Sequence, residues 1–504
     1  MRGLLQRASA NFKKPLAGSA WSPADDLPQG FQRYTASHTL PLSSLGTFCF
    51  AATGHYAKGT ILLRRGERDD EDGVESGPTG AASPPAYDAD TKPRFDGQVQ
   101  VDIEARSNSD GLYSSSTLEP VEGHERCGIS LTTPSGSSFG RIGASLSFHL
   151  TVTFPAGFTS LDTLSIEATH FRVLLDPSLS AIEFDNLDIS TTDAPILFDD
   201  LRAKSVKLRN ENRLDPNKGS LRNFDDLVSG SIAKSDHIDI ACENGAVSGS
   251  YRASGPITIS TTNFSIRGDY SGGSLRLSTG NGDITGVFEA KRDIIVQNAH
   301  GKIDGTWKAP MGLSIKGSYM PISGTFIVGQ ELRLITTVFR IDAEITILSN
   351  SSDGSSSGAA PVTRVESSAT DELPTFAAAV ASSQTLGAVN VLAETCDAGA
   401  ELVYARVPAD VVLRSSIKST GGSAIRVKHG ETFEGAFVAT SPVTHSCAVV
   451  LPEGPTAGRG MRSIRYDVEK RSHVSGVVGY EGSPAEGRSR TVIESGGPAE
   501  FTFA

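Results

Sequence analysis

The sequence predicts a mostly-β protein: a single-stranded, right-handed β-helix (β-solenoid) with coils of about 19 residues, together with a second β-rich repeat region. A glycine followed two residues later by an aromatic recurs five times, at intervals of 19, 18, 19 and 19 residues. Short segments in which apolar and polar residues alternate lie at the same distance along the chain from each of these glycines. The 504 residues include 52 glycines and only 4 methionines, and no long apolar stretch has helical spacing. The five repeats are Gly249-Ser250-Tyr251, Gly268-Asp269-Tyr270, Gly286-Val287-Phe288, Gly305-Thr306-Trp307 and Gly324-Thr325-Phe326.

The first 94 residues are expected to contain a disordered tail (1–37), two or three N-terminal strands (38–65) and an acidic disordered loop (66–94). Apolar and polar residues alternate between residues 38 and 65. The loop is rich in Gly, Pro, Ser and acidic residues, so it buries too little apolar surface to offset the entropy of ordering. Its acidic run, Asp69 to Asp72, lacks the glycine and the spacing of an EF-hand, and we interpret it as a solvated charge run.

A solenoid domain is predicted over residues 95–348. Alternation resumes at Val99, and the strand from Leu146 to Phe154 places its apolar residues on one face and its polar residues on the other. His149 lies on that polar face, which indicates an exposed strand histidine rather than a general base. From about Leu187 the 19-residue period takes over.

Each repeat unit contains two short strands, called a and b. Strand a is typified by Ile238-x-Ile240 and strand b by Val247-x-Gly249-x-Tyr251. Residues two and four apart share a strand face, so the aromatics are expected to point into the core. We expect each glycine to leave room for its ring. The first outward position of strand b, the outward row, is polar throughout: Ser248, Arg267, Thr285, Asp304, Ser323 and Asp342.

Two arrangements of strands a and b fit this pattern. Asn244-Gly245 and Asn281-Gly282 are typical of type I′ hairpins and favour an antiparallel meander. The equivalent pairs Asn263-Phe264 and Tyr319-Met320 do not suit such a tight turn. Like residues recurring in register suit parallel coils stacked about 4.8 Å apart, which we favour, with the right-handed coiling that is usual for parallel crossovers.

A low-complexity linker is predicted over residues 349–372, followed by a C-terminal β-rich domain over residues 373–504, and the sequence leaves open whether this domain stacks on the solenoid. The linker is rich in Ser, Gly and Ala with scattered charges. The repeat pattern returns in a looser form beyond it, as Phe433-x-Gly435-x-Phe437 and Val474-x-Gly476-x-Val478. The chain ends on Phe501-Thr-Phe503, which is expected to form a closing strand.

The repeats NGAVSGSY, NGDITGVF and HGKIDGTW, within residues 238–345, resemble the putative-adhesin domain family of unknown function found in bacteria and fungi. The wider layout is similar to uncharacterised basidiomycete fungal proteins, through the segments SHTLPLSSLGTFCFAATGHYAKGTILLRR, FEGAFVATS, GRGMRS and VSGVVGYEG. The resemblance implies a β-solenoid. It implies little about activity, because one fold serves many functions.

The main alternative function is a carbohydrate-active β-helix enzyme, either a polysaccharide lyase or a hydrolase. Polygalacturonase-like sites need clustered aspartates with Gly-His-Gly and Arg-x-Lys elements, of which His300-Gly301 is a fragment. His300 occupies a turn position, and we interpret it as a turn residue in a left-handed conformation. Asp236-His237 lacks a nucleophile elbow, and no helix follows Gly280-Asn281-Gly282 to bind phosphate. We therefore predict no catalytic, cofactor-binding or metal residues.

Composition limits the partners and the cellular setting. A net charge of −12 argues against nucleic-acid binding, and no apolar stretch is long enough to cross a membrane. The basic N-terminal segment allows mitochondrial import as a minor alternative to an intracellular, cytoplasmic setting. Five scattered cysteines form no disulfide framework: Cys49, Cys127, Cys242, Cys396 and Cys447. We expect a non-catalytic, adhesin-like binding or scaffolding protein whose partner, a protein or a glycan, is unknown.

Overall fold

The computed structural model describes residues 31–41, 46–66, 98–123, 126–134, 144–211, 227–349, 388–451, 462–480 and 489–503. Strands dominate this part of the chain, which has one short α-helix and one 3-10 helix. No helix in it is long and apolar enough to cross a membrane. The chain divides into two compact units: unit 1 comprises Met1–Gly273 and Leu277–Gly282, and unit 2 comprises Ser274–Arg276 and Asp283–Ala504.

Within the described residues, unit 1 contains both helices and the strands β1 to β17. Its elements are β1 (Gln32–Pro41), β2 (Thr47–Thr53), β3 (Gly59–Arg65), β4 (Gln98–Ser107), α1 (Asp110–Ser114), β5 (Thr117–Gly123), β6 (Arg126–Thr132), β7 (Leu146–Phe154), β8 (Ser160–Thr169), β9 (Phe171–Leu175), η2 (Pro177–Ala181), β10 (Glu183–Thr192), β11 (Ile196–Phe198), β12 (Leu201–Glu211), β13 (Val228–Ser235), β14 (His237–Cys242), β15 (Val247–Ala253), β16 (Pro256–Thr261) and β17 (Ile266–Gly272).

Unit 2 contains the strands that follow, and β18 (Ser274–Thr279) has residues in both units. Its strands are β19 (Ile284–Ala290), β20 (Asp293–Asn298), β21 (Ile303–Ala309), β22 (Gly312–Gly317), β23 (Ile322–Val328), β24 (Glu331–Thr336), β25 (Ile341–Ile347), β26 (Ala388–Thr395), β27 (Ala400–Arg406), β28 (Val412–Ser419), β29 (Ile425–His429), β30 (Gly435–Thr440), β31 (Cys447–Val450), β32 (Arg462–Lys470), β33 (His473–Tyr480), β34 (Ser489–Ser495) and β35 (Ala499–Phe503).

Parallel pairing between residues 19 apart defines the repeat. In unit 1, Gly249 pairs with Gly268 and Tyr251 with Tyr270 across β15 and β17. In unit 2, β21 pairs with β23 in the same register. Strands a and b of one coil belong to opposite faces, and their apolar residues are buried between them. The predicted β-solenoid is therefore confirmed, and the Asn-Gly pairs lie at coil corners rather than in hairpins.

The ladder glycines are required by the backbone. Gly268 and Gly324 have φ angles of 141° and 135°. A Cβ on Gly324 would lie 2.0 Å from the carbonyl oxygen of Gly305 in the preceding coil. The glycine thus permits a positive φ and close stacking of the backbones. This differs from the expectation that it leaves room for the neighbouring ring.

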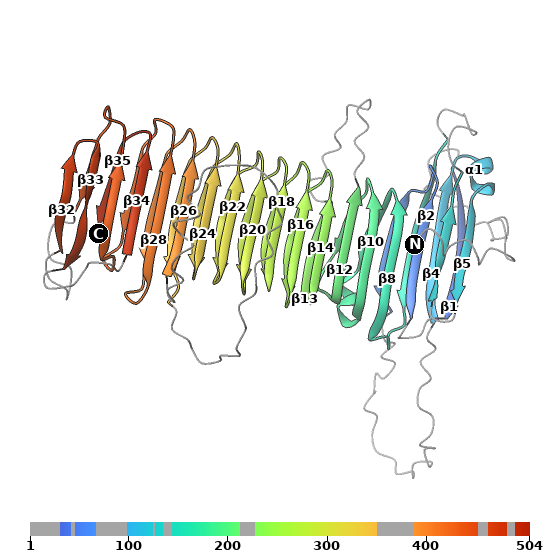
Figure 1. The fold of residues 1–504 in the computed structure, drawn as a ribbon. Helices are drawn as coiled ribbons and strands as arrows, with labels where there is room; N and C mark the ends of the chain where they lie inside the picture. The colour runs from blue at the N-terminus through green and yellow to red at the C-terminus, as the bar shows by residue number, and fades with distance from the viewer. Residues whose placement is uncertain are drawn as a thin grey trace, which may run out of the picture. The chain divides into compact units, whose positions relative to one another are not determined.

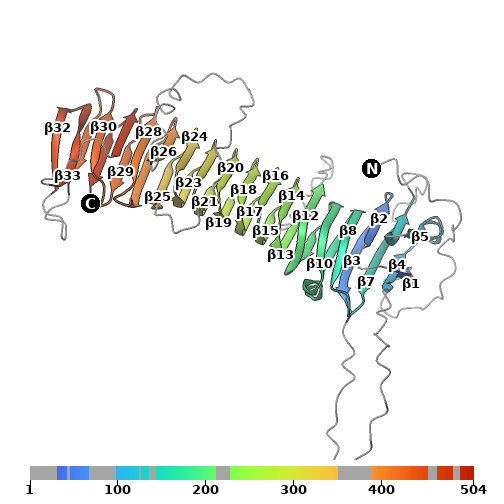
Figure 2. The same cartoon turned by 60° about the horizontal axis from the view of Figure 1, so that its bottom comes forward.

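The N-terminal end of unit 1 departs from sequence order. Strands β2 and β3 form a coil inserted between β6/β7 and β8/β9, with parallel pairing on both sides. Figure 2 shows β3 beside β7 and β8 beside β10. Antiparallel pairs β1–β4, β4–β7 and β5–β6 close this end. The predicted N-terminal strands are thus part of the solenoid, and β1 begins at Gln32, inside the region expected to be a tail.

Unit 2 continues its coils past the predicted linker. Strand β26 pairs with β24 and β27 with β25, both in parallel, across residues 350–387. Figure 1 shows β20, β22, β24, β26 and β28 side by side. The C-terminal strands therefore stack on the preceding coils of unit 2, a question that the sequence left open. Most of the predicted tail, acidic loop and linker lies outside the described residues.

The last coil of unit 2 is also inserted out of sequence order. Strands β34 and β35 lie between β28/β29 and β30/β31 and pair in parallel with both. Strand β33 then pairs antiparallel with β30, and β32 pairs antiparallel with β33. Both the order of strands and the sense of pairing change at this end of the stack.

Candidate interaction surface

The outward row faces solvent, as its polarity predicts. In unit 1, Arg267 is exposed, and the Ser248 hydroxyl donates to Ser229 Oγ in the preceding coil at 3.0 Å. In unit 2 the corresponding residues are half-buried. The hydroxyl of Ser323 donates to Oδ1 of Asp304 at 2.9 Å. Ser248 and Ser323 are thus hydrogen-bonded to the preceding coil.

Basic side chains compensate the carboxylates of this row in unit 2. Nζ of Lys302 lies 2.7 Å from Oδ2 of Asp304. The Lys302 hydrogen bond lowers the pKa of the Asp304 carboxyl, while partial burial acts in the opposite direction. Arg340 contacts Asp342 and lies 2.7 Å from Oε2 of Glu401. These carboxylates are held in ion pairs rather than as a pair that shares a proton.

The corners after strand a carry an amide ladder in unit 1. Asn263 donates through Nδ2 to Oδ1 of Asn244, and Asn281 donates to Oδ1 of Asn263 at 2.6 Å. The backbone nitrogens of Gly280 and Asn281 donate to the carbonyl oxygen of Thr262. Identical side chains in register thus repeat the hydrogen bond from coil to coil.

The equivalent corners of unit 2 carry apolar and aromatic side chains instead. We call these the turn patch: His300, Tyr319, Met320, Val338 and Phe339. Tyr319 is 51% exposed and Phe339 is 42% exposed. The rings of His300 and Tyr319 stack with centroids 4.9 Å apart and an interplanar angle of 6°. Tyr319 and Phe339 thus expose large apolar side chains at two successive corners, with Met320 and Val338 half-buried beside them.

The backbone holds the turn patch in place. The backbone nitrogen of Tyr319 donates to the carbonyl of Ala299, and that of Val338 donates to Ser318. Oδ1 of Asn298 accepts from the backbone nitrogens of His300 and Gly301, at 3.1 and 2.9 Å. His300 is not among the residues with positive φ, so the expected left-handed conformation is wrong. The Asn298 side chain closes the turn instead.

Sequence reasoning missed the buried polar residues that end strand a. Thr261 donates to the carbonyl of Phe264 at 2.5 Å, and Asn298 donates through Nδ2 to Gly301 at 2.7 Å. Each satisfies a carbonyl three residues onward inside the corner. The signal was present in the sequence, because a polar residue recurs there after two apolar strand positions.

The aromatics of the glycine ladder are interior. Tyr251, Tyr270, Phe288, Trp307 and Phe326 are at most 1% exposed. The Tyr251 and Tyr270 rings stack at 5.1 Å, and those of Phe288 and Trp307 at 4.1 Å. Both tyrosine hydroxyls donate to backbone carbonyls three residues earlier. These rings are therefore not available for stacking with a sugar at the surface.

Two other residues singled out in the sequence belong to different parts of unit 1: His149 lies on β7, and Asp236 lies between β13 and β14. His149 is exposed on β7, and Asp236 accepts from the Ser254 hydroxyl at 2.8 Å. In the described ranges, no cluster of three His, Cys, Asp or Glu side chains could hold a metal ion. The run Asp69 to Asp72 lies outside them. None of the five cysteines forms a disulfide, and burial raises the pKa of the Cys242 thiol to about 12.

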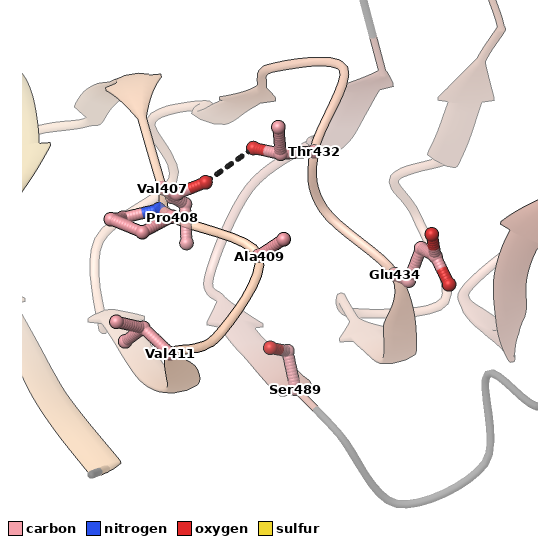
Figure 3. A pocket seen from close by; sticks show the side chains of 7 residues that line it. All are labelled: Val407, Pro408, Ala409, Val411, Thr432, Glu434 and Ser489. Carbon is pink, nitrogen blue, oxygen red and sulfur yellow. Dashed lines mark hydrogen bonds between the residues drawn. The ribbon is translucent and has the colours of Figure 1, made fainter. Parts of the chain in front are cut away.

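A small pocket lies between two loops of unit 2 (Figure 3). Its volume is about 20 Å³, enough for about one water molecule. The Thr432 hydroxyl donates to the carbonyl of Val407 across it at 2.5 Å. The pocket is lined by Val407, Pro408, Ala409, Val411, Thr432, Glu434 and Ser489.

Comparisons with known proteins do not assign the chain to a family. No family model and no curated protein matches the chain. Among solved structures, the chain is similar to one described as a "putative cell adhesion protein" from Clostridium sporogenes. The two share 7% identity, the match covers 94% of this chain and 99% of the other, and the TM-score is 0.14.

Proposed function

We propose that the protein is a non-catalytic binding or scaffolding protein of the adhesin-like type, and that the turn patch of unit 2 binds another protein. The observation that carries the proposal is the exposure of Tyr319 and Phe339 at successive corners, beside Met320 and Val338. Contiguous exposed apolar patches mark interaction sites. The residues of the putative-adhesin resemblance, HGKIDGTW among them, include His300 of this patch.

The chemistry of the patch favours a protein partner over a glycan. Sugars stack on open faces of aromatic rings, whereas His300 and Tyr319 cover each other's faces at 4.9 Å. Protein interfaces are enriched in Tyr, Phe, Met and Arg around a small apolar centre. Arg340 follows Phe339 directly, and its side chain is 54% exposed. It supplies a polar rim to the patch.

The test compares partners captured by three forms of the full chain. Tyr319→Ser with Phe339→Ser should lose specific partners, measured by cross-linking in cells that express the protein and quantitative mass spectrometry. Val287→Ser is the matched control, because Val287 is 50% exposed on β19 and outside the patch. It should retain the same partners. Partners that bind all three forms equally would contradict the proposal.

The alternative of a carbohydrate-active enzyme is tested separately. Incubating the protein with a panel of polysaccharides should produce no new reducing ends. Their appearance would overturn the non-catalytic part of the proposal and leave the patch to be tested alone.

An intracellular setting is also part of the proposal. All five cysteines are free of disulfides, which is usual for proteins in reducing compartments. Fractionation of the native cells should recover the protein in the cytosol. Its recovery in the culture supernatant or in mitochondria would contradict this setting.

A further inference from the structure

One of the interior columns of side chains in the b strands of unit 2 continues through the C-terminal coils. Parallel registers join each member to the next coil's residue at the same position. The column continues the glycine ladder's aromatics into the C-terminal coils. Its members are Phe288, Trp307, Phe326, Ile345, Tyr404, His429 and Phe503. His429 is therefore the one member whose side chain can gain a proton and a positive charge.

The surroundings of His429 suit a neutral ring. The residue is fully buried, and its ring stacks on Tyr404 at 4.7 Å and on Phe433 at 3.9 Å. Nε2 lies 3.1 Å from the hydroxyl oxygen of Thr491 on β34, whereas Nδ1 is buried without a hydrogen-bond partner. Protonation would place N–H groups on both nitrogens, so at least one donor would remain unsatisfied in the core.

One charged group near the ring, the guanidinium of Arg462, opposes protonation as well. Arg462 of β32 is 6% exposed, and its guanidinium carbon lies 5.3 Å from the ring centroid of Phe503 and 5.7 Å from that of Tyr480. The Tyr404 hydroxyl is hydrogen-bonded to Ser415. In the described residues, no carboxylate forms an ion pair or hydrogen bond with His429. Burial, and secondly the charge of Arg462, lower the pKa of His429 to about 3.

The contacts of His429 join β29, on which it lies, to the coil formed by β34 and β35. Thr491 and Phe503 belong to β34 and β35, the coil inserted between β28/β29 and β30/β31. Strand β33 pairs with β30, which pairs with β34, and β32 pairs with β33. Arg462 of β32 and Tyr480 of β33 also donate to the carbonyls of Phe433 and Glu431 in the loop after β29. If β34 and β35 leave, the strands stacked beyond them lose their strand pairing to β28 and β29 and keep only these contacts with the loop after β29.

We propose that His429 is an acid-operated release for the C-terminal coil of unit 2. Opening detaches β34 and β35, with the strands stacked on them, from β28 and β29 and exposes the His429 ring. Acid then favours the opened form, because the exposed ring can bind a proton there. Opening exposes the aromatic interior and the edges of β28 and β29. In neutral solution the ring stays uncharged and the coil stays closed.

The sign of the effect follows from linkage. The pKa of His429 in the closed form lies below its ordinary value of about 6.5, so the closed form binds fewer protons. The contribution of the neutral His429 ring to the stability of the closed form is fully present above pH ~6.5. This contribution falls as the pH decreases through this value towards the closed-form pKa. Between pH 7.5 and 5 the opening equilibrium should rise about 30-fold.

The experiment is hydrogen exchange of the full chain at pH 7.5 and 5.0, read by mass spectrometry and corrected for the intrinsic exchange rate at each pH. Peptides covering residues 489–503 should show the rise of about 30-fold in opening. His429→Phe should remove it, because Phe fits the column and cannot titrate. His149→Phe, a change of an exposed histidine on β7, should leave it intact.

A second variant allows the test to be made if His429→Phe alone does not fold. His429→Phe leaves the Thr491 hydroxyl without its partner, so His429→Phe with Thr491→Val removes both polar groups together. The proposal requires the pH response to disappear in whichever of the two variants folds. A wild-type protein with no pH response at residues 489–503, or a variant that keeps the response, would overturn it.

Discussion

At the scale of single residues, strand parity predicted where the aromatics point but not why glycine precedes them. The interior positions of Tyr251 and Trp307 follow from alternation along the strand alone and are confirmed. The role of Gly249 or Gly268 depends on a carbonyl in another coil, 1.8 to 1.9 Å from a would-be Cβ. Such a contact requires knowledge of the stacking distance and of φ, which the sequence pattern does not contain.

Replacing a ladder glycine should destabilise the protein strongly. Gly324→Ala places a side chain at φ 135° and against the carbonyl of Gly305, so we expect a loss of at least about 2 kcal/mol of unfolding free energy. Gly312→Ala is the control, because nothing lies within 4 Å of its Cβ position. Chemical denaturation measures both. Equal stability of the two variants would show that close stacking does not require the ladder glycine.

The interior ring of Trp307 should contribute heavily to stability. Trp307→Ala is expected to lose about 3 to 5 kcal/mol, because it opens a cavity between stacked rings. Trp307→Phe should lose less than about 1.5 kcal/mol, since Phe occupies the same column position in both adjacent coils and Trp307 Nε1 has no hydrogen-bond partner. Denaturant titration distinguishes the two. A large loss in the Phe variant would indicate that ring stacking is not the main contribution.

At the scale of elements, recurrence in register distinguished coils from hairpins. The Asn-Gly pairs at 244–245 and 281–282 suggest hairpins when read locally, whereas the recurrence of Asn244, Asn263 and Asn281 indicates lateral stacking. The structure shows the recurrence to be a hydrogen-bonded ladder. A local turn signal is therefore weaker evidence here than the period of the whole repeat.

The amide ladder should stabilise the corners of unit 1. Asn263→Ala removes hydrogen bonds to the coils on both sides, so we expect a loss of about 1 to 2 kcal/mol. Asn186→Ala is the matched control, because this exposed amide makes only a 3.5 Å contact with the carbonyl of Asp162. Thermal melting compares them. A control as destabilised as the ladder variant would argue against the ladder.

Order within the stack could not be predicted from the sequence. Strands β2/β3 and β34/β35 have the same alternation as any other coil, and the pattern does not say which neighbours they join. Their insertion is set by long-range pairing, with residues such as Ser415 and Thr491 lying 76 positions apart. The turn patch escaped prediction for a related reason, since Tyr319 and Phe339 become a surface only when successive corners are aligned.

At the scale of the whole molecule, each unit owes its stability to contacts between adjacent coils. One coil buries three or four aliphatic or aromatic side chains at about 1.5 to 3 kcal/mol each, which is marginal against the entropy of ordering its residues. Stacking adds the interface terms. The antiparallel strands β1 and β4 in unit 1, and β32 and β33 in unit 2, lie where the parallel coils end. Such a change in pairing limits continued parallel growth at these ends.

The most direct test of the parallel solenoid is cross-linking between coils. Thr306→Cys with Thr325→Cys, in a Cys396→Ser background, places two thiols on directly paired outward residues of β21 and β23. A disulfide should form on mild oxidation, because neighbouring strands bring Cα atoms within bridging range. Thr306→Cys with Glu344→Cys, two coils apart through Thr325, should not bridge. Mass spectrometry of the oxidised proteins decides: a bridge in the first pair only is the predicted result, and its absence there, or equal bridging in both pairs, would contradict the solenoid.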